Sequence, residues 1–319
     1  MSENEPESVD RRMVFRNVQL LKPEDRVANS QILQFISTNA NIGNYMPVRA
    51  IQDMLGQEAD VWNMHRPADW DFINNNYKAI VIGGAGLLAR PFNHFWVACA
   101  EHCKLPIIVW GIGTCIIDGL AAQDTMCDVE AVNSVFKRAL MVNVRDEVTA
   151  ELYGAGIENE ISITACPTIA YLRDFDVQAE AKTLTLSVHP ELIDEQTHDR
   201  IQQVCEAAGY NVLLTKNVQT PEEGLEDIIR YYFCRSELVV STRLHGAITA
   251  YGLGIPYLAL PGDEKVREFQ RLYGGGQLFD NTDALAELLA QTHVRQPLPN
   301  LGEILAFGER ARVALAAIN

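Results

Sequence analysis

Short apolar runs alternate along the chain with longer segments in which apolar residues recur at helical spacing. The runs expected to be strands are 32–37, 79–83, 106–111 and 140–144. The helical segments between them are 46–55, 92–103, 128–139 and 147–153. Strands that alternate with helices in this way predict a parallel sheet that is covered by helices on both faces.

The same alternation starts again after a polar, charged stretch at 174–182. The second series consists of strands 183–189, 211–215, 238–242 and 256–260, helices 192–208, 222–234, 244–253 and 264–273, and then a short strand and a helix from Asp283. We therefore expect an α/β protein with two Rossmann-like domains, 30–176 and 177–319, that face each other across a cleft in a GT-B-like arrangement. Residues 1–29 are expected to be a disordered tail.

Charge and composition narrow the classes of partner. The chain has 26 Lys and Arg against 42 Asp and Glu, which gives a net charge of −16 and makes a nucleic-acid or anionic-membrane surface improbable. No stretch approaches the roughly 20 apolar residues of a membrane span, and the acidic N-terminus has no signal-peptide core, so we expect a cytoplasmic protein. The seven cysteines and the histidines lack the spacing of metal ligands, so we expect reduced thiols and no metal site.

The segment "STRLHG" marks the place where a buried strand gives way to a helix. Arg243 lies at the last position of the strand or just past it, and His245 and Gly246 open the helix, where free backbone N–H groups and the helix dipole favour an anion. An arginine at this point can hold a carboxylate or a phosphate through two hydrogen bonds. The alternative is structural: Arg243 would pair with an acidic neighbour and His245 would cap the helix.

A second arginine ends a strand of the first domain. Arg145 in "VNVRDE" is assigned to the same strand-end position as Arg243, which would direct both side chains into one cleft. Its structural alternative is an ion pair with Asp146 or Glu147. A histidine at the end of strand 183–189, His189, is a second-rank candidate at the same edge.

Glycine clusters follow three strands of the first domain. They contain Gly83, Gly84 and Gly86, then Gly111 and Gly113, and earlier Gly43 with Asn44. Glycine at a strand end lets the backbone approach a ligand closely. None of the clusters has the spacing of a dinucleotide-binding fingerprint or of a P-loop, so a nicotinamide enzyme and a P-loop NTPase both lack their signature.

With these residues in place, the chain resembles the polysaccharide pyruvyl transferase family from about Ile32 to Tyr273. The segments that carry the resemblance are "NIGNYM", "AIVIGGAGLL", "GIG", "VRDEVTAELYGAGI", "DIIRYYFCRSELVVSTRLHGAITAYGLGIP" and "DEKVREF". The strand followed by Arg-Leu-His is the most specific of them. The chain departs from the family pattern at Cys166, where an acid is more usual, at His189, where an arginine is more usual, and in "GGAG", which interrupts an all-glycine run.

The resemblance implies a transferase of cell-surface polysaccharide biosynthesis. Such an enzyme moves the pyruvyl group of phosphoenolpyruvate onto two hydroxyls of a saccharide, forms a cyclic ketal and releases phosphate, without a further cofactor or metal. The implied donor-binding residues are Arg145, Arg243, Leu244, His245, Gly246 and Lys265, with His245 and Arg243 catalytic. Two arginines would clamp the donor, and His245 would deliver a proton to its methylene carbon.

The resemblance also gives the first domain as the acceptor side and the second as the donor side. Candidates on the acceptor side or of second rank are Gly43, Asn44, Gly84, Gly86, Gly113 and His189. The acceptor would be a saccharide, free or linked to a lipid or a nucleotide, and a homo-oligomer is compatible with the sequence.

Two other functions share this architecture. A GT-B glycosyltransferase would use a nucleotide sugar, but "RLHGAITAYGLGIP" lacks the acidic residue that would hold the ribose. A non-catalytic sugar- or anion-binding regulator would have little need for Arg145, Arg243 and His245 together. Binding assays with phosphoenolpyruvate and with nucleotide sugars would separate these functions.

Overall fold

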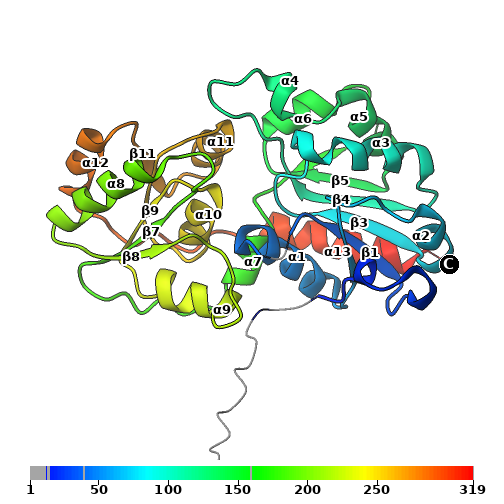
Figure 1. The fold of residues 1–319 in the computed structure, drawn as a ribbon, viewed down its shortest axis with the longest axis horizontal. Coiled ribbons are helices and arrows are strands. Elements are labelled where there is room, and N and C mark those ends of the chain that lie inside the picture. The colour runs from blue at the N-terminus through cyan, green and yellow to red at the C-terminus, as the bar shows by residue number, and fades with distance from the viewer. Residues whose placement is uncertain (1–11, 13–14, 39, 159, 319) are drawn as a thin grey trace, which may run out of the picture.

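The computed structural model describes residues 12, 15–38, 40–158 and 160–318, which form two α/β lobes (Figure 1). The strands of the first lobe are β1 (Ile32–Ile36), β2 (Asp60–Asn63), β3 (Ala79–Gly83), β4 (Ile107–Ile112), β5 (Met141–Val144) and β6 (Ile161–Ile163). Its helices are α1 (Ile42–Leu55), α2 (Trp70–Asn76), α3 (Asn93–His102), α4 (Ala122–Thr125), α5 (Val129–Arg138), α6 (Glu147–Tyr153) and α7 (Thr168–Leu172). Short 3-10 turns lie at Val18–Leu20, Pro23–Asp25 and Arg90–Phe92.

The second lobe repeats the alternation of strands and helices. Its strands are β7 (Thr183–Ser187), β8 (Asn211–Thr215), β9 (Leu238–Ser241), β10 (Tyr257–Ala259) and β11 (Gly276–Leu278). Its helices are α8 (Glu195–Ala207), α9 (Leu225–Ile228), α10 (Leu244–Gly252), α11 (Glu264–Tyr273) and α12 (Thr282–Leu289). The segment 222–234, expected to be one helix, is α9 followed by a π-helical turn at Ile229–Phe233. The sequence interpretation had not assigned β2, β6, α2, α4, α7 or the last helix, Gly302–Ala316.

The two sheets have the same topology. The first runs β2-β1-β3-β4-β5-β6 and the second β11-β10-β9-β7-β8, and all pairs of neighbouring strands are parallel. In sequence order within each lobe, the first sheet reads 2-1-3-4-5-6 and the second 2-1-3-4-5, so the chain reverses its direction of winding between β1 and β3 and again between β7 and β9. Ligands bind beyond the carboxyl ends of strands at such switch points. The prediction of two Rossmann-like domains is confirmed.

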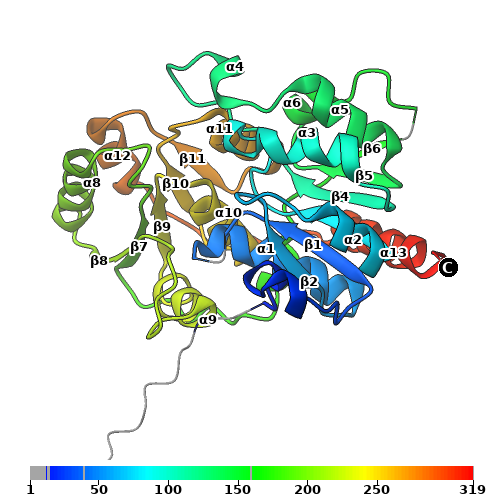
Figure 2. The same ribbon diagram turned by 45° about the vertical axis from the view of Figure 1, so that its right-hand side comes forward.

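Burial explains why the central strands are continuous apolar runs. Every residue of β1, β3, β4 and β7 is buried, as expected for parallel strands that are covered on both faces. A separate apolar cluster joins the lobes: Ile42 and Met46 of α1 pack in it with Ile169 of α7 and Ile248 of α10. Figure 2 shows α1 and α10 side by side between the two sheets. This shared core fixes how the carboxyl edges of the sheets face each other.

The last helix returns to the first lobe. Helix α13 (Gly302–Ala316) packs against α1, and Phe307 and Ala311 join the cluster below the first sheet, where the Phe307 ring lies 5.0 Å from that of Trp110. The predicted second domain, 177–319, therefore extends too far, because its final helix belongs in space to the first lobe. The physical reason is that Trp110 and Ile108 of β4 present an apolar face that α1 alone does not cover.

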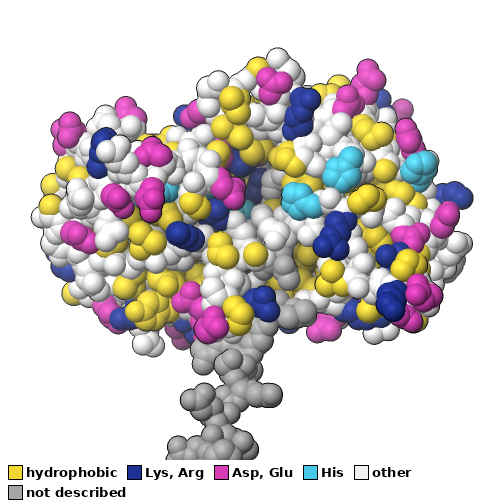
Figure 3. All heavy atoms as spheres, in the orientation of Figure 1, with side chains coloured by type: hydrophobic (Ala, Val, Ile, Leu, Met, Phe, Trp, Pro, Cys, Tyr) yellow, Lys and Arg dark blue, Asp and Glu magenta, His cyan; other side chains and the backbone are white. Residues whose placement is uncertain are grey.

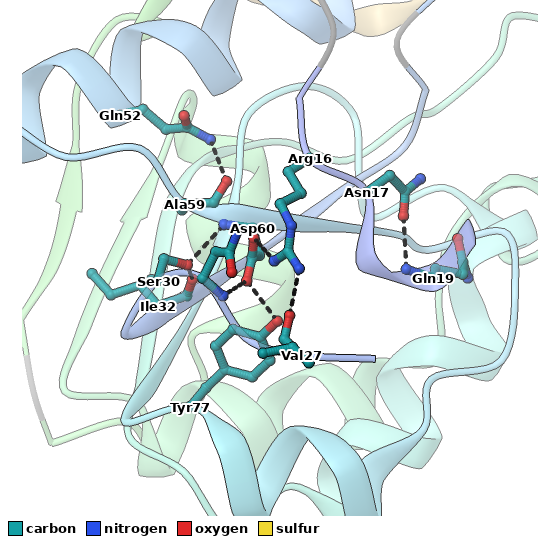
Figure 4. Close-up of polar contacts among 11 residues, drawn as sticks. Arg16, Asn17, Gln19, Val27, Ser30, Ile32, Gln52, Ala59, Asp60 and Tyr77 are labelled. Carbon is teal, nitrogen blue, oxygen red and sulfur yellow. Dashed lines mark hydrogen bonds and ion pairs between the residues drawn. The ribbon is translucent and has the colours of Figure 1, made fainter. Parts of the chain in front are cut away.

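Residues 15–29 also depart from the predicted boundaries. This part of the expected tail folds along the edge strand β2: Arg16 pairs with Asp60 at 2.7 Å, and Asn17 forms a parallel bridge with Val61. The buried Asp60 carboxylate also accepts hydrogen bonds from the Tyr77 hydroxyl at 2.9 Å and the Asn29 N–H at 2.8 Å (Figure 4). Apart from Arg12, the expected tail before Phe15 lies outside the described residues.

Within the described ranges, no helix is both long and apolar enough to cross a bilayer.

Candidate active site

A cavity of about 560 Å³ lies between the lobes at the carboxyl ends of both sheets, a size typical of small-molecule sites. The space-filling view shows the surface hollowed between the lobes, with basic side chains visible in its depth (Figure 3). Ser37 and Thr38 after β1 line the cavity on one side, and His189 after β7 and Arg243 after β9 line it on the other. The switch points of both lobes thus meet in one space.

Arg145 enters this cavity with no ion-pair partner among the residues that the structure describes. The two acidic residues that could have paired with it are engaged elsewhere: Asp146 accepts the Thr149 N–H at 2.7 Å as the cap of α6, and Glu147 pairs with Arg271 at 2.7 Å. Arg145 is 6% exposed, and all its guanidinium nitrogens are buried without a hydrogen-bond partner. A buried, unpaired charge is costly, so this arrangement indicates a site for an anion.

Arg145 and Arg243 do not follow equivalent strands of the two lobes, so the prediction that they occupy the same strand-end position is wrong. Arg243 follows β9, the third strand of its lobe, whereas Arg145 follows β5, the fifth strand of its own. The strand equivalent to β9 is β3, which is followed by the glycines 84 and 86. Arg145 therefore reaches the cavity from two strands away, across Gly113 and Gly86. A methyl group on Gly113 would lie 2.6 Å from Nη2 of Arg145, and one on Gly86 would lie 4.0 Å from it.

We predict that Gly113→Ala displaces the Arg145 guanidinium without unfolding the protein. The added methyl group meets the end of a flexible side chain, so the free energy of unfolding should change by no more than about 1 kcal/mol. Anion affinity should fall by about 10- to 100-fold, because the guanidinium is moved from its position. Calorimetric titration with phosphoenolpyruvate measures this effect. Gly86→Ala, whose methyl group clears the guanidinium, is the matched control and should lose much less affinity.

The turn that presents Arg243 is held by small side chains beneath it. The Ser241 hydroxyl donates to the Arg243 carbonyl at 2.7 Å and accepts the Arg243 N–H at 3.1 Å. Ser187 is paired with Ser241 in the register of β7 and β9, and a Cβ at Gly246 would overlap both serine hydroxyls. "STRLHG" therefore has glycine because α10 starts directly above this serine layer.

Arg243 is also a buried cation. It is 7% exposed, its Nε has no hydrogen-bond partner, and burial lowers its pKa, while Glu191 acts in the opposite direction. Among the described residues no side chain caps α10, and the Gly246 N–H donates to the Arg243 carbonyl at 3.0 Å, so the N–H groups of Leu244 and His245 are the ones left for a ligand. The structural alternative, an arginine paired with a neighbouring acid beside a capping histidine, does not describe this turn.

His245 lies between the two lobes at the start of α10. Its ring packs against Gly43 of α1, where a Cβ would overlap the imidazole. Nε2 is buried and has no partner. Burial, followed by the charges of Arg145, Arg243 and Lys265, holds the pKa of His245 well below 6.5. The imidazole is therefore neutral in the unliganded protein at pH 7.

Lys265 completes the cationic end of the cavity. Its ammonium lies 3.0 Å from Asp263 Oδ2 and 3.1 Å from Cys115 Sγ. Burial opposes the charge of Lys265, but Asp263 and Cys115 outweigh burial and raise its pKa. Nearby, burial and then the charges of Arg243 and Lys265 lower the pKa of His189 to about 4, and its Nδ1 is buried without a partner.

Some of the remaining predicted residues line the cavity, and the others lie behind it and support the side chains that line it. Asn44, Gly86 and Leu244 line the cavity. Gly43, Gly113 and Gly246 lie behind it and make room for His245, Arg145 and the serine layer; Gly84, at φ +81°, packs against Pro47. These four glycines thus position protein groups, whereas the sequence interpretation had assigned them to ligand contact. Lining residues that were not predicted include the polar and aromatic residues Ser37, Thr38, Asn41, His65, Phe92, Cys115, Glu191 and Asp263, together with Ala40, Ala89, Pro190 and Val218. Only Ser37 and Thr38 carried a local signal, because they directly follow a buried strand.

Backbone contacts between the lobes close two edges of the cavity. Residues 40–42 form an antiparallel bridge with 217–219, in which the Gln219 N–H donates to the Ala40 carbonyl at 2.7 Å. Residues 116–118 form another with 262–264, in which the Glu264 N–H donates to the Ile116 carbonyl at 3.1 Å. The second bridge places the loop that carries Cys115 over Lys265.

Across the described ranges, no group of three or more His, Cys, Asp and Glu side chains is arranged to hold a metal ion. Asp263, the buried carboxylate of the cavity, is paired with Lys265. Whether an anion binds here without a metal remains a prediction.

Comparison with solved structures shows the same architecture at low identity. A functionally uncharacterised protein from Klebsiella pneumoniae matches with a TM-score of 0.51 and 13% identity, over 78% of this chain and 93% of that one. UDP-GlcNAc 2-epimerase from Methanocaldococcus jannaschii matches with a TM-score of 0.51 and 12% identity, over 89% of this chain and 99% of that one. These likenesses show the fold alone. No curated protein matches the sequence.

The comparison with protein families gives one match over most of the chain. The model described as polysaccharide pyruvyl transferase matches residues 41–264. The matched range begins at the cap of α1 and ends at the start of α11, so it contains Arg145, Arg243 and His245, and Lys265 follows it directly.

Proposed function

Since the chain belongs to the polysaccharide pyruvyl transferase family, and is therefore a transferase, we propose that it transfers the pyruvyl group of phosphoenolpyruvate to two hydroxyls of a saccharide. The observation that carries this proposal is Arg145, whose buried guanidinium has no partner and lies in one cavity with Arg243 and Lys265. A donor with both a carboxylate and a phosphate would pair with these cations and with the first-turn N–H groups of α10. The positive electrostatic potential is confined to this cavity, because the whole chain carries a net charge of −16.

We assign the proton transfers to the two histidines of the second lobe. In the first step His245 gives a proton to the methylene carbon of the donor, and positive charge develops at the adjacent carbon. A saccharide hydroxyl attacks that carbon and loses its proton to the neutral His189, whose low pKa in the free protein would be raised when the bound anion offsets the charges of Arg243 and Lys265. The second hydroxyl attacks the same carbon, and phosphate leaves with the electrons of the C–O bond. The product is a cyclic ketal, and the proton of the second hydroxyl leaves with phosphate or passes to solvent.

Donor binding should be coupled to the uptake of a proton. In the free protein burial and three cations keep His245 neutral, whereas a bound carboxylate and phosphate would reverse the sign of the local charge and raise its pKa. A group whose pKa rises on binding strengthens binding at low pH, and that contribution is lost as the pH rises through the bound-state pKa.

Calorimetry of phosphoenolpyruvate binding at pH 7 in buffers of different ionisation enthalpy measures this uptake. We expect a net uptake that is reduced in His245→Gln. Equal uptake in the two proteins would mean that His245 does not gain the proton.

The wall of the first lobe suits the acceptor. Asn41, Asn44 and Thr38 offer amides and a hydroxyl, and the rings of His65 and Phe92, which also line the cavity, lie 4.7 Å apart. Neutral polar groups beside a ring pair bind saccharides through hydrogen bonds and stacking. Arg145 and the C-terminal lobe supply the cationic side chains of the cavity wall, so donor and acceptor would occupy opposite ends.

We predict that His65→Ala weakens the binding of the saccharide acceptor and leaves the binding of phosphoenolpyruvate unchanged. Loss of one stacked ring should raise the KM of the saccharide by about two- to tenfold, corresponding to about 0.5–1.5 kcal/mol. Steady-state kinetics gives the KM, and calorimetry gives the Kd of phosphoenolpyruvate. His102→Ala removes an exposed histidine of the same lobe that does not line the cavity, and serves as the control. Unchanged acceptor KM in His65→Ala would place the saccharide elsewhere.

The direct test of the function uses purified protein, phosphoenolpyruvate and a panel of sugars that contain diols. Phosphate release together with a pyruvylated product of the expected mass would support the proposal. Binding of a nucleotide sugar without binding of phosphoenolpyruvate would instead favour a glycosyltransferase. Repeating the assay with a chelator tests the prediction that no metal is required, and the proposal places the reaction in the cytoplasm, where phosphoenolpyruvate is formed.

A further inference from the structure

One cysteine differs from the others in its exposure and in its neighbours. Six of the seven cysteines are buried, and Cys115 alone is partly exposed. It is also the cysteine that lines the cavity between the lobes. A reagent that enters the cavity therefore meets a single thiol, while the remaining thiols are shielded by packing.

Cys115 lies against a cation that reaches it from the other lobe. Lys265 Nζ donates to Cys115 Sγ at 3.1 Å, and the bridge between Ile117 and Asp263 holds the two segments together. Lys265 Nζ therefore places a positive charge at hydrogen-bond distance from the sulfur of a partly exposed cysteine. Partial exposure beside a cation is the environment in which cysteines react.

The same cavity contains buried side-chain nitrogens that have no hydrogen-bond partner among the described residues. Arg145 is 6% exposed with all its guanidinium nitrogens unpartnered, and Arg243 and His245 each present a buried nitrogen without a partner. These groups attract an anion independently of the thiol. We propose that Cys115 is a covalent modification site for small anionic electrophiles, such as carboxylates that carry a leaving group on the adjacent carbon.

The chemistry is a simple displacement. The thiol gives its proton to solvent, the sulfur forms a bond to the carbon next to the carboxylate, and the leaving group departs with the electrons of the bond that breaks. No oxidation occurs. The adduct places a carboxylate beside Lys265 and fills the cationic end of the cavity, so modification should block the binding of any other anion there.

The experiment compares iodoacetate with iodoacetamide, which have the same leaving group but differ in charge. We expect iodoacetate to modify Cys115 about tenfold faster than iodoacetamide does, as followed by mass spectrometry of the peptide that contains residue 115. Lys265→Met and Arg145→Ala should each reduce this preference. Lys104→Met removes a charge from an exposed lysine outside the cavity and is the matched control.

Faster modification by iodoacetamide than by iodoacetate, or first labelling at a different cysteine, would overturn the inference. Circular dichroism of each variant shows whether a lost preference reflects unfolding. Adding phosphoenolpyruvate separates this inference from the proposed function. Selective labelling that phosphoenolpyruvate does not slow would support the reactive thiol and count against the proposed donor. Absence of selectivity in a protein that binds phosphoenolpyruvate would refute only the reactive thiol.

Discussion

His245→Ala is expected to lower the turnover of pyruvyl transfer by about two to four orders of magnitude, the usual contribution of a positioned general acid. The fold should survive, because Nε2 of His245 has no hydrogen-bond partner whose loss would leave another buried group unsatisfied. The loss should appear mainly in kcat, since the arginines that would bind the donor remain in place. Single-turnover phosphate release and a thermal melt measure the two effects separately.

Transfer at the parental rate by a folded His245→Ala protein would remove this residue from the chemistry. His189, which also presents a buried and unpartnered nitrogen to the cavity, would then be the next candidate for the acid. The double variant His245→Ala/His189→Ala would show whether either histidine acts in its place.

Arg145→Ala is expected to lower the affinity for phosphoenolpyruvate by about 2–5 kcal/mol, which corresponds to a factor of roughly 30 to several thousand. The same substitution should leave the melting temperature of the free protein unchanged or raise it. It removes a buried cation that the unliganded protein does not pair, so stability and function respond in opposite directions.

The control for Arg145→Ala is Arg271→Ala. Arg271 is an exposed arginine that pairs with Glu147 and Glu268, so its loss should change affinity by no more than about 1 kcal/mol. A lower melting temperature with unchanged donor affinity in Arg145→Ala would identify Arg145 as a structural residue.

The pattern of apolar positions predicted most of the sheet structure because a strand that is buried on both faces must be apolar throughout. Strand 79–83, helix 147–153, strand 211–215 and helix 264–273 have the predicted bounds. The pattern missed one long element, the 15-residue helix α13. The strands that it missed, β2 and β6, are short and lie at the two edges of the first sheet. Such strands bury less surface and so leave a weaker periodic signal.

The candidate site was predictable where its residues lie at the ends of buried strands. Arg243, His245 and Arg145 could be placed at the cavity because the carboxyl ends of parallel strands share one edge. His65 and Cys115 lie in loops whose local sequence has no periodicity, and only the folded chain brings them to the cavity wall.

By itself, the sequence determined two parallel sheets, the strand-to-helix turn of "STRLHG" and a cationic pair in an acidic chain, since burial and turn geometry are encoded by neighbouring residues. Tertiary structure alone decided that α13 covers the first lobe and that Arg145 reaches the switch point over Gly113 and Gly86. It also decided that the glycines make room for side chains as well as for a ligand. The physical reason is that a local pattern states which faces must be buried, whereas the surface that buries each face is chosen by packing between residues far apart in the chain.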